Sequence, residues 1–165
     1  MRKLCHVPSD GQNGGLGLFW KADCNLHVQT FSPNHIDAHI ISNNQPPWRI
    51  TGFYGRPKGQ WKHESWSLLR HLHARASMSW VCLGNFNEIL QSSEKQGGNP
   101  KPLAPTLDFK ETLLHCGLEG LGYQGYPFTW HNDRPRDTFV EVRLDRACAS
   151  TKWQGQFPLA KVLCL

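Results

Sequence analysis

The 165-residue sequence contains no apolar run long enough to cross a membrane and no N-terminal stretch of the kind that directs secretion. Its six cysteines lack the dense, regular spacing of a disulfide-stabilised scaffold. Internal repeats and low-complexity segments are also missing. These absences argue against a membrane protein and a small disulfide-rich secreted protein. They predict a soluble, intracellular chain, in the nucleus or the cytoplasm, with room for one sizeable core.

Acidic residues are scarce relative to basic ones. The chain has 13 Asp and Glu against 18 Lys and Arg, a net charge of +5 and a pI near 9.0. This excess favours an anionic partner such as nucleic acid, although the basic residues are scattered and the same balance occurs in proteins that bind none. The seven tryptophans fit either a nucleotide-facing surface or, more simply, core packing.

A zinc site is conceivable on a Cys-x-x-His spacing that includes Cys24 and His27. Cys5 and His6 would have to supply the other two ligands. Structural zinc sites need two well-spaced ligand pairs, and the second pair is missing here. We therefore do not expect zinc.

Alternating apolar residues and turn residues predict a succession of strands, and helical spacing predicts two helices. Strands are expected at 14–20, 26–30, 35–42, 48–54, 80–83, 127–130 and 139–149, helices at 64–76 and 106–116, and an exposed loop at 91–106. Residues 1–13 are polar and irregular and are predicted to form a mobile leader. Residues 14–165 are predicted to form a single domain. Hairpin-linked strands followed by a strand–helix–strand crossover predict a mixed sheet.

The central feature of the sequence is the run at residues 80–90. Its first four residues are apolar and predict a buried strand, Gly84 ends the strand, and Asn85, Asn87 and Glu88 follow. A buried strand that leads into a polar cluster is how an α/β sheet presents chemistry at the carboxyl end of a strand. The simpler alternative is a strand exit in which Asn85 and Asn87 cap a turn.

Residues 84–88, Gly-Asn-Phe-Asn-Glu, resemble the Gly-Asp-Phe-Asn motif of the endonuclease/exonuclease/phosphatase superfamily, and most closely the endonuclease domains of plant LINE-type (non-LTR) retrotransposons. Further stretches agree in the same order: 14–20, 35–38, 48–55, 63–66, 94–98, 128–130 and 143–146. The resemblance covers roughly residues 13 to 160. It implies an α/β fold, an incomplete four-layer sandwich of two mixed β-sheets flanked by helices, in a chain truncated at both ends.

The resemblance also implies a chemistry. In this superfamily two Glu or Asp ligands hold Mg²⁺, the motif Asp positions or deprotonates a water, and a histidine oriented by an Asp completes the site. Carried over, Asn87 orients the phosphate, the hydroxyl of Tyr54 reaches it, and Asp145 matches the histidine-orienting carboxylate. Trp130 and Arg143 resemble groove-lining, nucleic-acid-binding positions. Two alternatives stay open: Tyr54 as a packing aromatic and Asp145 as a salt-bridged surface residue.

The departures from the family pattern bear on activity. Asn85 stands at the catalytic position of the motif Asp, and an amide neither accepts a proton nor binds a hard cation as a carboxylate does. Residues 1–13 contain no Glu to act as the N-terminal metal ligand, and the Ser-Asp-His ending that carries the catalytic histidine is absent. Glu88 or Asp10 could be a substitute ligand, but nothing in their spacing supports it. The metal ligands are therefore unassigned.

These observations predict a degenerate copy of a Mg²⁺-dependent DNA endonuclease of a retrotransposon, catalytically impaired. Its expected partner is DNA, with no membrane and no small-molecule cofactor, and a full-length relative would also carry a reverse transcriptase domain. Three alternatives remain. They are a non-catalytic nucleic-acid-binding module, an active nuclease or phosphatase with unorthodox ligands, and a translated transposon relic without a selected function.

Overall fold

The structure, a computed structural model, describes residues 2–9 and 14–164. No helix among these residues has the length and apolar character needed to span a membrane. The strands are β1 Arg2–Val7, β2 Leu16–Lys21, β3 Leu26–Ser32, β4 His35–Ser42, β5 Gln45–Tyr54, β6 Ser79–Asn85, β7 Lys95–Gln96, β8 Leu118–Gly120, β9 Gln124–Gly125, β10 Trp130–His131, β11 Glu141–Val142, β12 Asp145–Ser150 and β13 Leu163–Cys164. The helices are α1 Lys62–Arg75, α2 Leu103–His115 and α3 Thr151–Gln156, with short 3₁₀ turns η1 Gly59–Trp61, η2 Ser92–Glu94 and η3 Arg136–Thr138.

A six-stranded sheet in the order β3-β4-β5-β6-β12-β8 forms the centre of the molecule. Within this sheet only β5 and β6 run parallel, and α1 makes the crossover that joins them. The other neighbours in this sheet pair antiparallel. The sheet is therefore mixed, as predicted, and the carboxyl ends of β5 and β6 meet at one end of it.

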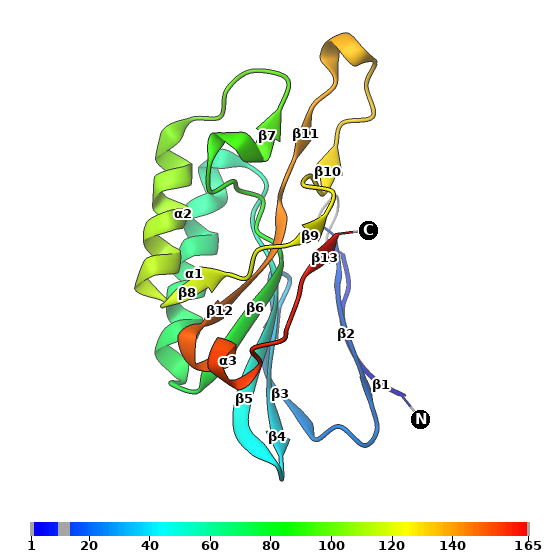
Figure 1. The fold of residues 1–165 in the computed structure, drawn as a ribbon, viewed down its shortest axis with the longest axis vertical. Coiled ribbons are helices and arrows are strands. Elements are labelled where there is room, and N and C mark those ends of the chain that lie inside the picture. The colour runs from blue at the N-terminus through cyan, green and yellow to red at the C-terminus, as the bar shows by residue number, and fades with distance from the viewer. Residues whose placement is uncertain (1, 10–13, 165) are drawn as a thin grey trace.

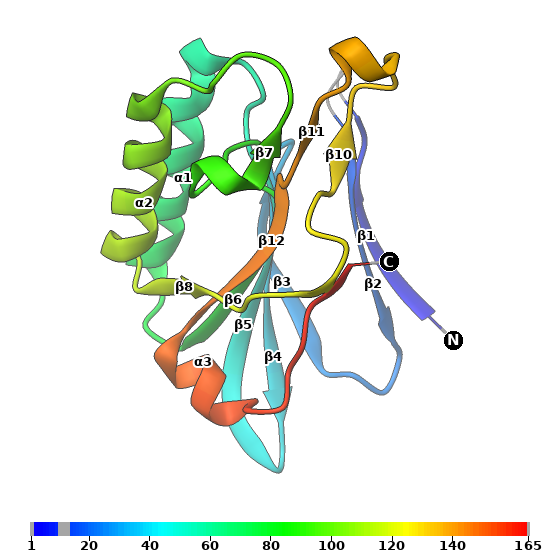
Figure 2. The same cartoon turned by 45° about the horizontal axis from the view of Figure 1, so that its top comes forward.

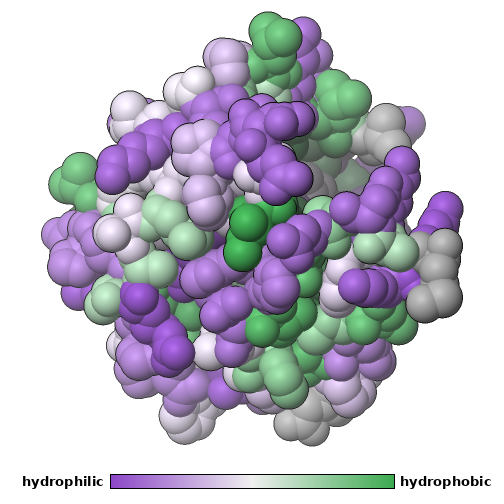
Figure 3. Space-filling model, turned by 90° about the horizontal axis from the view of Figure 1, so that it is seen from below, coloured by the Kyte–Doolittle hydropathy of each residue, from purple (hydrophilic) through white to green (hydrophobic). Residues whose placement is uncertain are grey.

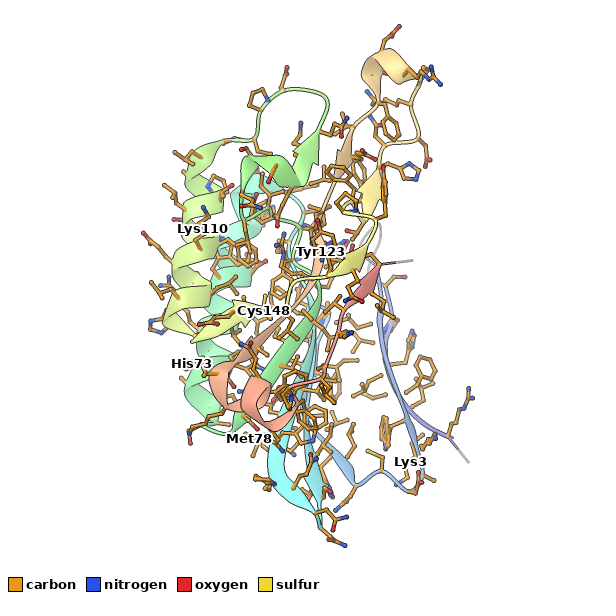
Figure 4. The ribbon with its side chains drawn as sticks, viewed as in Figure 1. Lys3, His73, Met78, Lys110, Tyr123 and Cys148 are labelled. Atoms are coloured by element: carbon orange, nitrogen blue, oxygen red, sulfur yellow. The ribbon has the colours of Figure 1, made fainter. Side chains whose placement is uncertain are left out.

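Helices α1 and α2 lie side by side on one face of this sheet (Figure 1). Between them and the sheet is the main core, in which Trp66 of α1 stacks on Phe109 of α2 with ring centroids 4.6 Å apart. Phe53 and Phe86 complete this aromatic group and are fully buried. Each such side chain contributes about 1.5–3 kcal/mol on burial, so this group anchors the strand ends. Cys148 of β12 lies in the same core (Figure 4).

The opposite face of the central sheet is covered by a second layer of short strands (Figures 1 and 2). This layer consists of three pieces: the hairpin β1-β2, the sheet β10-β11-β7, and the parallel pair β13-β9. Helix α3 also packs on this face, since its Trp153 contacts Val81 and Ala149. The α/β sandwich expected from the sequence is confirmed, with its second sheet divided. The lower end of the molecule, seen in Figure 3, has interspersed apolar and polar residues.

Four sequence predictions need correction. Residues 2–7, expected to be an irregular leader, form β1, which pairs with β2 from Arg2↔Lys21 to Val7↔Leu16. Their polar composition concealed the strand because most of its side chains are exposed and only Val7 is buried. Residues 10–13 of that expected leader lie outside the described residues.

The strand predicted at 139–149 is divided into β11 and β12. The backbone N–H of Arg143 donates to the carbonyl of Glu94, and those of Leu144 and Asp145 donate to Oγ1 of Thr129. These partners lie outside a regular ladder, so the strand breaks there. The strand predicted at 127–130 likewise begins only at its last residue, and α2 begins within the predicted loop.

Candidate functional site

The two central sequence motifs meet where β5 and β6 end. Tyr54 is the register partner of Asn85, and the N–H of Gly55 donates to the carbonyl of Asn85 at 2.7 Å. A Cβ on Gly55 would lie 2.3 Å from the carbonyl oxygen of Phe86. Gly84 has φ +138°, and a Cβ there would lie 2.1 Å from the carbonyl oxygen of Phe53. Both positions therefore require glycine because the two backbones approach too closely for any side chain.

The asparagines of the central motif hold the loop after β6. Oδ1 of Asn85 accepts from the N–H of Asn87 at 2.8 Å, and Nδ2 of Asn87 donates to the carbonyl of Gly55 at 2.7 Å. Asn87 has φ 56°, a left-handed conformation that asparagine tolerates better than most residues. Both side chains thus cap a turn, as the simpler alternative proposed. An Asp at position 85 would accept the same hydrogen bond, so Asn85 preserves the turn and changes only the charge.

A cleft of about 810 Å³ opens beside this loop. Tyr54, Asn85, Asn87 and Trp130 all line it, so the structure brings together four of the six residues that the sequence singled out. Its walls come from the ends of β5 and β6, from the segment that leads into α1, and from the sheet β10-β11-β7. The volume falls in the range of sites for small and medium-sized ligands.

Four basic side chains line the cleft: Arg56, Lys58, Lys95 and Lys101. Arg56 forms an exposed ion pair with Glu64 at 3.0 Å, and Lys101 lies 3.4 Å from Glu88. The Lys95 ammonium donates to the carbonyls of Gly97 and Asn99. Within the described part of the chain, Lys58 and Lys95 have no carboxylate at ion-pair distance, so both contribute uncompensated positive charge.

Aromatic rings accompany these charges. Trp61 and Trp130 line the cleft and are each 45% exposed, which is unusual for tryptophan in this fold, where Trp66, Trp80 and Trp153 are buried. Tyr54 also lines the cleft and is half-buried. A Cβ on Gly14 would lie 3.6 Å from its ring, so the glycine pair before β2 passes close to the site.

The donor set does not fit Mg²⁺. No Asp, Glu or His in the described ranges lines this cleft, and these ranges contain no group of three or more residues that could hold a metal ion. Hard divalent cations bind carboxylate oxygens, and the neutral amides of Asn85 and Asn87 are engaged in the turn. Asp10, one substitute ligand considered above, lies outside the described residues.

Glu88, the other substitute, is committed to the fold. It is 1% exposed, pairs with the Lys62 ammonium and accepts from the N–H of Ile89 at 2.9 Å. Burial opposes ionisation, but the hydrogen bonds from Lys62 and Ile89 outweigh it, and the pKa of Glu88 is lowered. Burial lowers the pKa of Lys62. The carboxylate is therefore ionised but enclosed, with its charge balanced inside the protein.

Asp145 lies next to the cleft rather than in it. It is the register partner of Asn85 across β12 and β6, yet it lines an adjacent depression of about 640 Å³. Trp130 lines both. Among the described residues, no histidine hydrogen-bonds to the Asp145 carboxylate and neither flanking arginine pairs with it. Its histidine-orienting role stays a prediction.

Arg143 is not brought into the cleft. It is 4% exposed, its guanidinium lies 3.6 Å from the centre of the Tyr123 ring, and Nη1 donates to the carbonyl of Pro127 at 3.2 Å. These contacts tie the residues on either side of β9 to the break between β11 and β12. The nucleic-acid-binding role of Arg143 stays a prediction. Sequence reasoning missed Lys58 and Trp61, whose signal was their place directly after the strand that carries Tyr54.

Other motif residues also stabilise the fold. Oδ1 of buried Asp37 accepts from Nε of Arg49 at 2.8 Å and from Oγ1 of Thr51 at 2.5 Å. Arg146 forms a bidentate ion pair with Glu94, in which Nη1 donates to Oε1 at 3.0 Å and Nη2 donates to Oε2 at 2.9 Å. The side chains of these residues therefore stabilise the fold and do not line the cleft.

The chain matches no protein-family model, and no curated protein matches it significantly. Among solved structures it is similar to the endonuclease domain of TRAS1, a telomere-specific non-LTR retrotransposon, with a TM-score of 0.71 and 12% identity over 91% of this chain and 67% of that one. It also aligns with an endonuclease/exonuclease/phosphatase family protein from Leptotrichia buccalis C-1013-b, with a TM-score of 0.49, 16% identity, and coverage of 92% and 61%. The first likeness shows the fold and agrees with the resemblance drawn from the sequence. The restriction to plant elements stays a prediction.

Proposed function

We propose that this chain, which has the fold of a non-LTR retrotransposon endonuclease domain, is a catalytically impaired copy of a Mg²⁺-dependent DNA endonuclease that still binds nucleic acid. One observation carries the proposal. The cleft at the ends of β5 and β6 presents four basic side chains, three aromatic rings and two amides, and none of the described residues adds a carboxylate.

The binding half of the proposal follows from charge and shape. Lysine and arginine neutralise phosphates and release condensed counterions, which is the main source of sequence-independent affinity for nucleic acid. Lys58 is exposed and supplies such a contact at the cleft rim. Tyr54 and Asn87 line the same cleft as Lys58, and among the described residues Nδ2 of Asn87 keeps one N–H free beside its bond to the carbonyl of Gly55. We keep for them the phosphate-contacting roles predicted above.

The catalytic half follows from the missing acid. Hydrolysis of a phosphodiester by a bound metal needs carboxylate ligands and a group that accepts the proton of water. Asn85 can do neither, and Glu88 is enclosed by Lys62 and Lys101. Loss of a general base alone lowers the rate by about 10²–10⁴-fold. In a full-length relative we propose that such a domain is joined to a reverse transcriptase domain.

The test is a supercoiled-plasmid nicking assay with Mg²⁺ or Mn²⁺, run on the unmodified chain and on Asn85→Asp. We expect no nicking by the unmodified chain beyond the EDTA control. We expect little gain in Asn85→Asp, because one restored carboxylate does not make a ligand set. Nicking by the unmodified chain that EDTA abolishes would contradict the impairment. Strong nicking by the variant alone would place the whole defect at position 85.

A further inference from the structure

We infer that the cleft is built to hold a single-stranded polynucleotide, with bases stacked on Trp61 and Trp130 and the backbone along the basic rim. This inference rests on the proposed function and deepens it by naming the form of the nucleic acid. It goes beyond a general affinity for polyanions because it assigns a separate role to each kind of side chain in the lining.

The two tryptophans of the cleft come from different parts of the fold. Trp61 ends η1, at the start of the helical layer, whereas Trp130 begins β10, in the second layer. The two rings therefore reach the same cleft from the two layers on either side of the central sheet. Each is 45% exposed, although tryptophan gains most from burial. A half-exposed ring on each side of one cleft provides two apolar faces for a flat ligand.

The form of a nucleic acid decides whether its bases can stack on these rings. Bases in a duplex are stacked on one another, so their faces are not available to a protein ring. A single strand presents its bases freely, and stacking on aromatic side chains is the usual sequence-tolerant way to bind it. The cleft volume of about 810 Å³ is that of a site for a ligand of modest size. It accommodates a short stretch of one strand, while a duplex would contact only the rim.

Basic side chains line the same cleft as the two rings. Lys58 and Lys95 line the same cleft without a carboxylate partner among the described residues, and Arg56 shares its charge with the exposed Glu64. A positive groove combined with stacking platforms is the arrangement found in proteins that bind single strands without sequence preference. The two features predict different effects: loss of charge weakens binding to any nucleic acid, whereas loss of a ring weakens binding to single strands only.

The experiment is a fluorescence anisotropy titration in EDTA, with labelled oligonucleotides of about 12 nucleotides as DNA, as RNA, and as a matched DNA duplex. We expect the single strands to bind at least about 10-fold more tightly than the duplex, with the DNA and RNA arms showing whether the 2′-hydroxyl matters. Trp130→Ala and Trp61→Ala should each lower single-strand affinity by about 5- to 150-fold and leave duplex affinity unchanged. Lys58→Ala should weaken both to a similar extent.

Two controls separate stacking from damage to the fold. Trp130→Phe keeps an aromatic face and should retain most of the single-strand affinity. Phe31→Ala removes an aromatic side chain that is 66% exposed on β3, outside the cleft, and should change nothing. Circular dichroism melts check that each variant is folded.

The outcomes distinguish this inference from the proposal beneath it. Duplex binding as tight as single-strand binding, or tryptophan variants that bind like the unmodified chain, would overturn the inference and leave nucleic-acid binding intact. No binding to any of the three oligonucleotides would overturn both.

Discussion

The ion pair between Arg146 and Glu94 gives the sharpest test of how the site is held in place. Its side chains are 5% and 13% exposed, and the guanidinium also donates to the carbonyls of Glu88 and Arg143. Glu94 precedes Lys95 on the cleft wall, so the pair fixes the segment that carries one of the cleft cations. Arg146→Met removes the charged partner of Glu94, whose carboxylate keeps only the N–H of Leu90 as a donor within the described ranges, and leaves two carbonyls without the guanidinium.

Removal of one partner from a buried pair costs about 3–5 kcal/mol. The two orphaned carbonyls place Arg146→Met at the upper end, about 4–5 kcal/mol, which corresponds to a fall in Tm of about 8–20 °C for a chain of this size. Urea unfolding followed by tryptophan fluorescence measures the loss. The double variant Arg146→Met with Glu94→Leu should recover much of it, because the uncompensated charge is gone.

The matched control is the exposed pair of Arg56 and Glu64, whose side chains are 39% and 41% exposed. Glu64→Gln should cost less than about 1 kcal/mol because solvent screens such pairs. A loss below about 1 kcal/mol for Arg146→Met, or equal losses for the two variants, would refute the reasoning that burial makes the Arg146 pair structurally important.

Three further predictions concern the core and the strand ends. Gly84→Ala should destabilise the chain by at least about 1–3 kcal/mol, because φ is +138° and the new Cβ would lie 2.1 Å from the carbonyl oxygen of Phe53; an unchanged melt would contradict this. Burial lowers the pKa of His35, so as the pH falls the unfolded chain binds this proton before the folded chain does. The contribution of neutral His35 to the free energy of unfolding should be complete above about pH 6.5 and decrease as the pH drops below it. His35→Gln should therefore flatten the decline of Tm with falling pH. Burial raises the pKa of Cys148 to about 11, so iodoacetamide at mildly alkaline pH should label half-buried Cys5 well before Cys148, as mass spectrometry would show; equal rates would count against a closed core.

Local signals in the sequence predicted the parts of the fold that depend on local patterns. The run at 80–90 predicted a buried strand that leads into two asparagines, and β6 does so, although it continues through Gly84 and ends at Asn85. The order of hairpins followed by a crossover predicted the mixed sheet, because only a helix-length connection joins parallel strands.

Parts that depend on distant partners could not be predicted. Residues 2–7 form a strand because β2 supplies its ladder, although their own composition is that of a polar tail. Strands β9 and β13 are two residues each and pair over Leu163↔Gln124, with no alternation to reveal them. The family resemblance predicted a groove-lining position for both Arg143 and Trp130. Only Trp130 lines the cleft, because the guanidinium of Arg143 stacks on Tyr123 and donates to the carbonyl of Pro127.

The same limit applies to the site. The family resemblance predicted the positions of catalytic groups and assigned no role to the basic residues that follow β5. Arg56 and Lys58 become a feature only when the fold places them beside Lys95 and Lys101, which are far along the chain. The basic lining of the cleft is therefore a result of topology.

The measurement that tests the central claim most directly is the salt dependence of nucleic-acid binding in EDTA, between about 50 and about 200 mM salt, for the unmodified chain and Lys58→Ala. The cleft predicts an affinity that falls with a log–log slope of about −2 to −3, from three or four phosphate contacts to a single strand, and a slope shallower by about 0.7 in the variant. An affinity that does not change with salt concentration, or a Lys58→Ala variant with an unchanged slope, would contradict the claim that nucleic acid binds in this cleft.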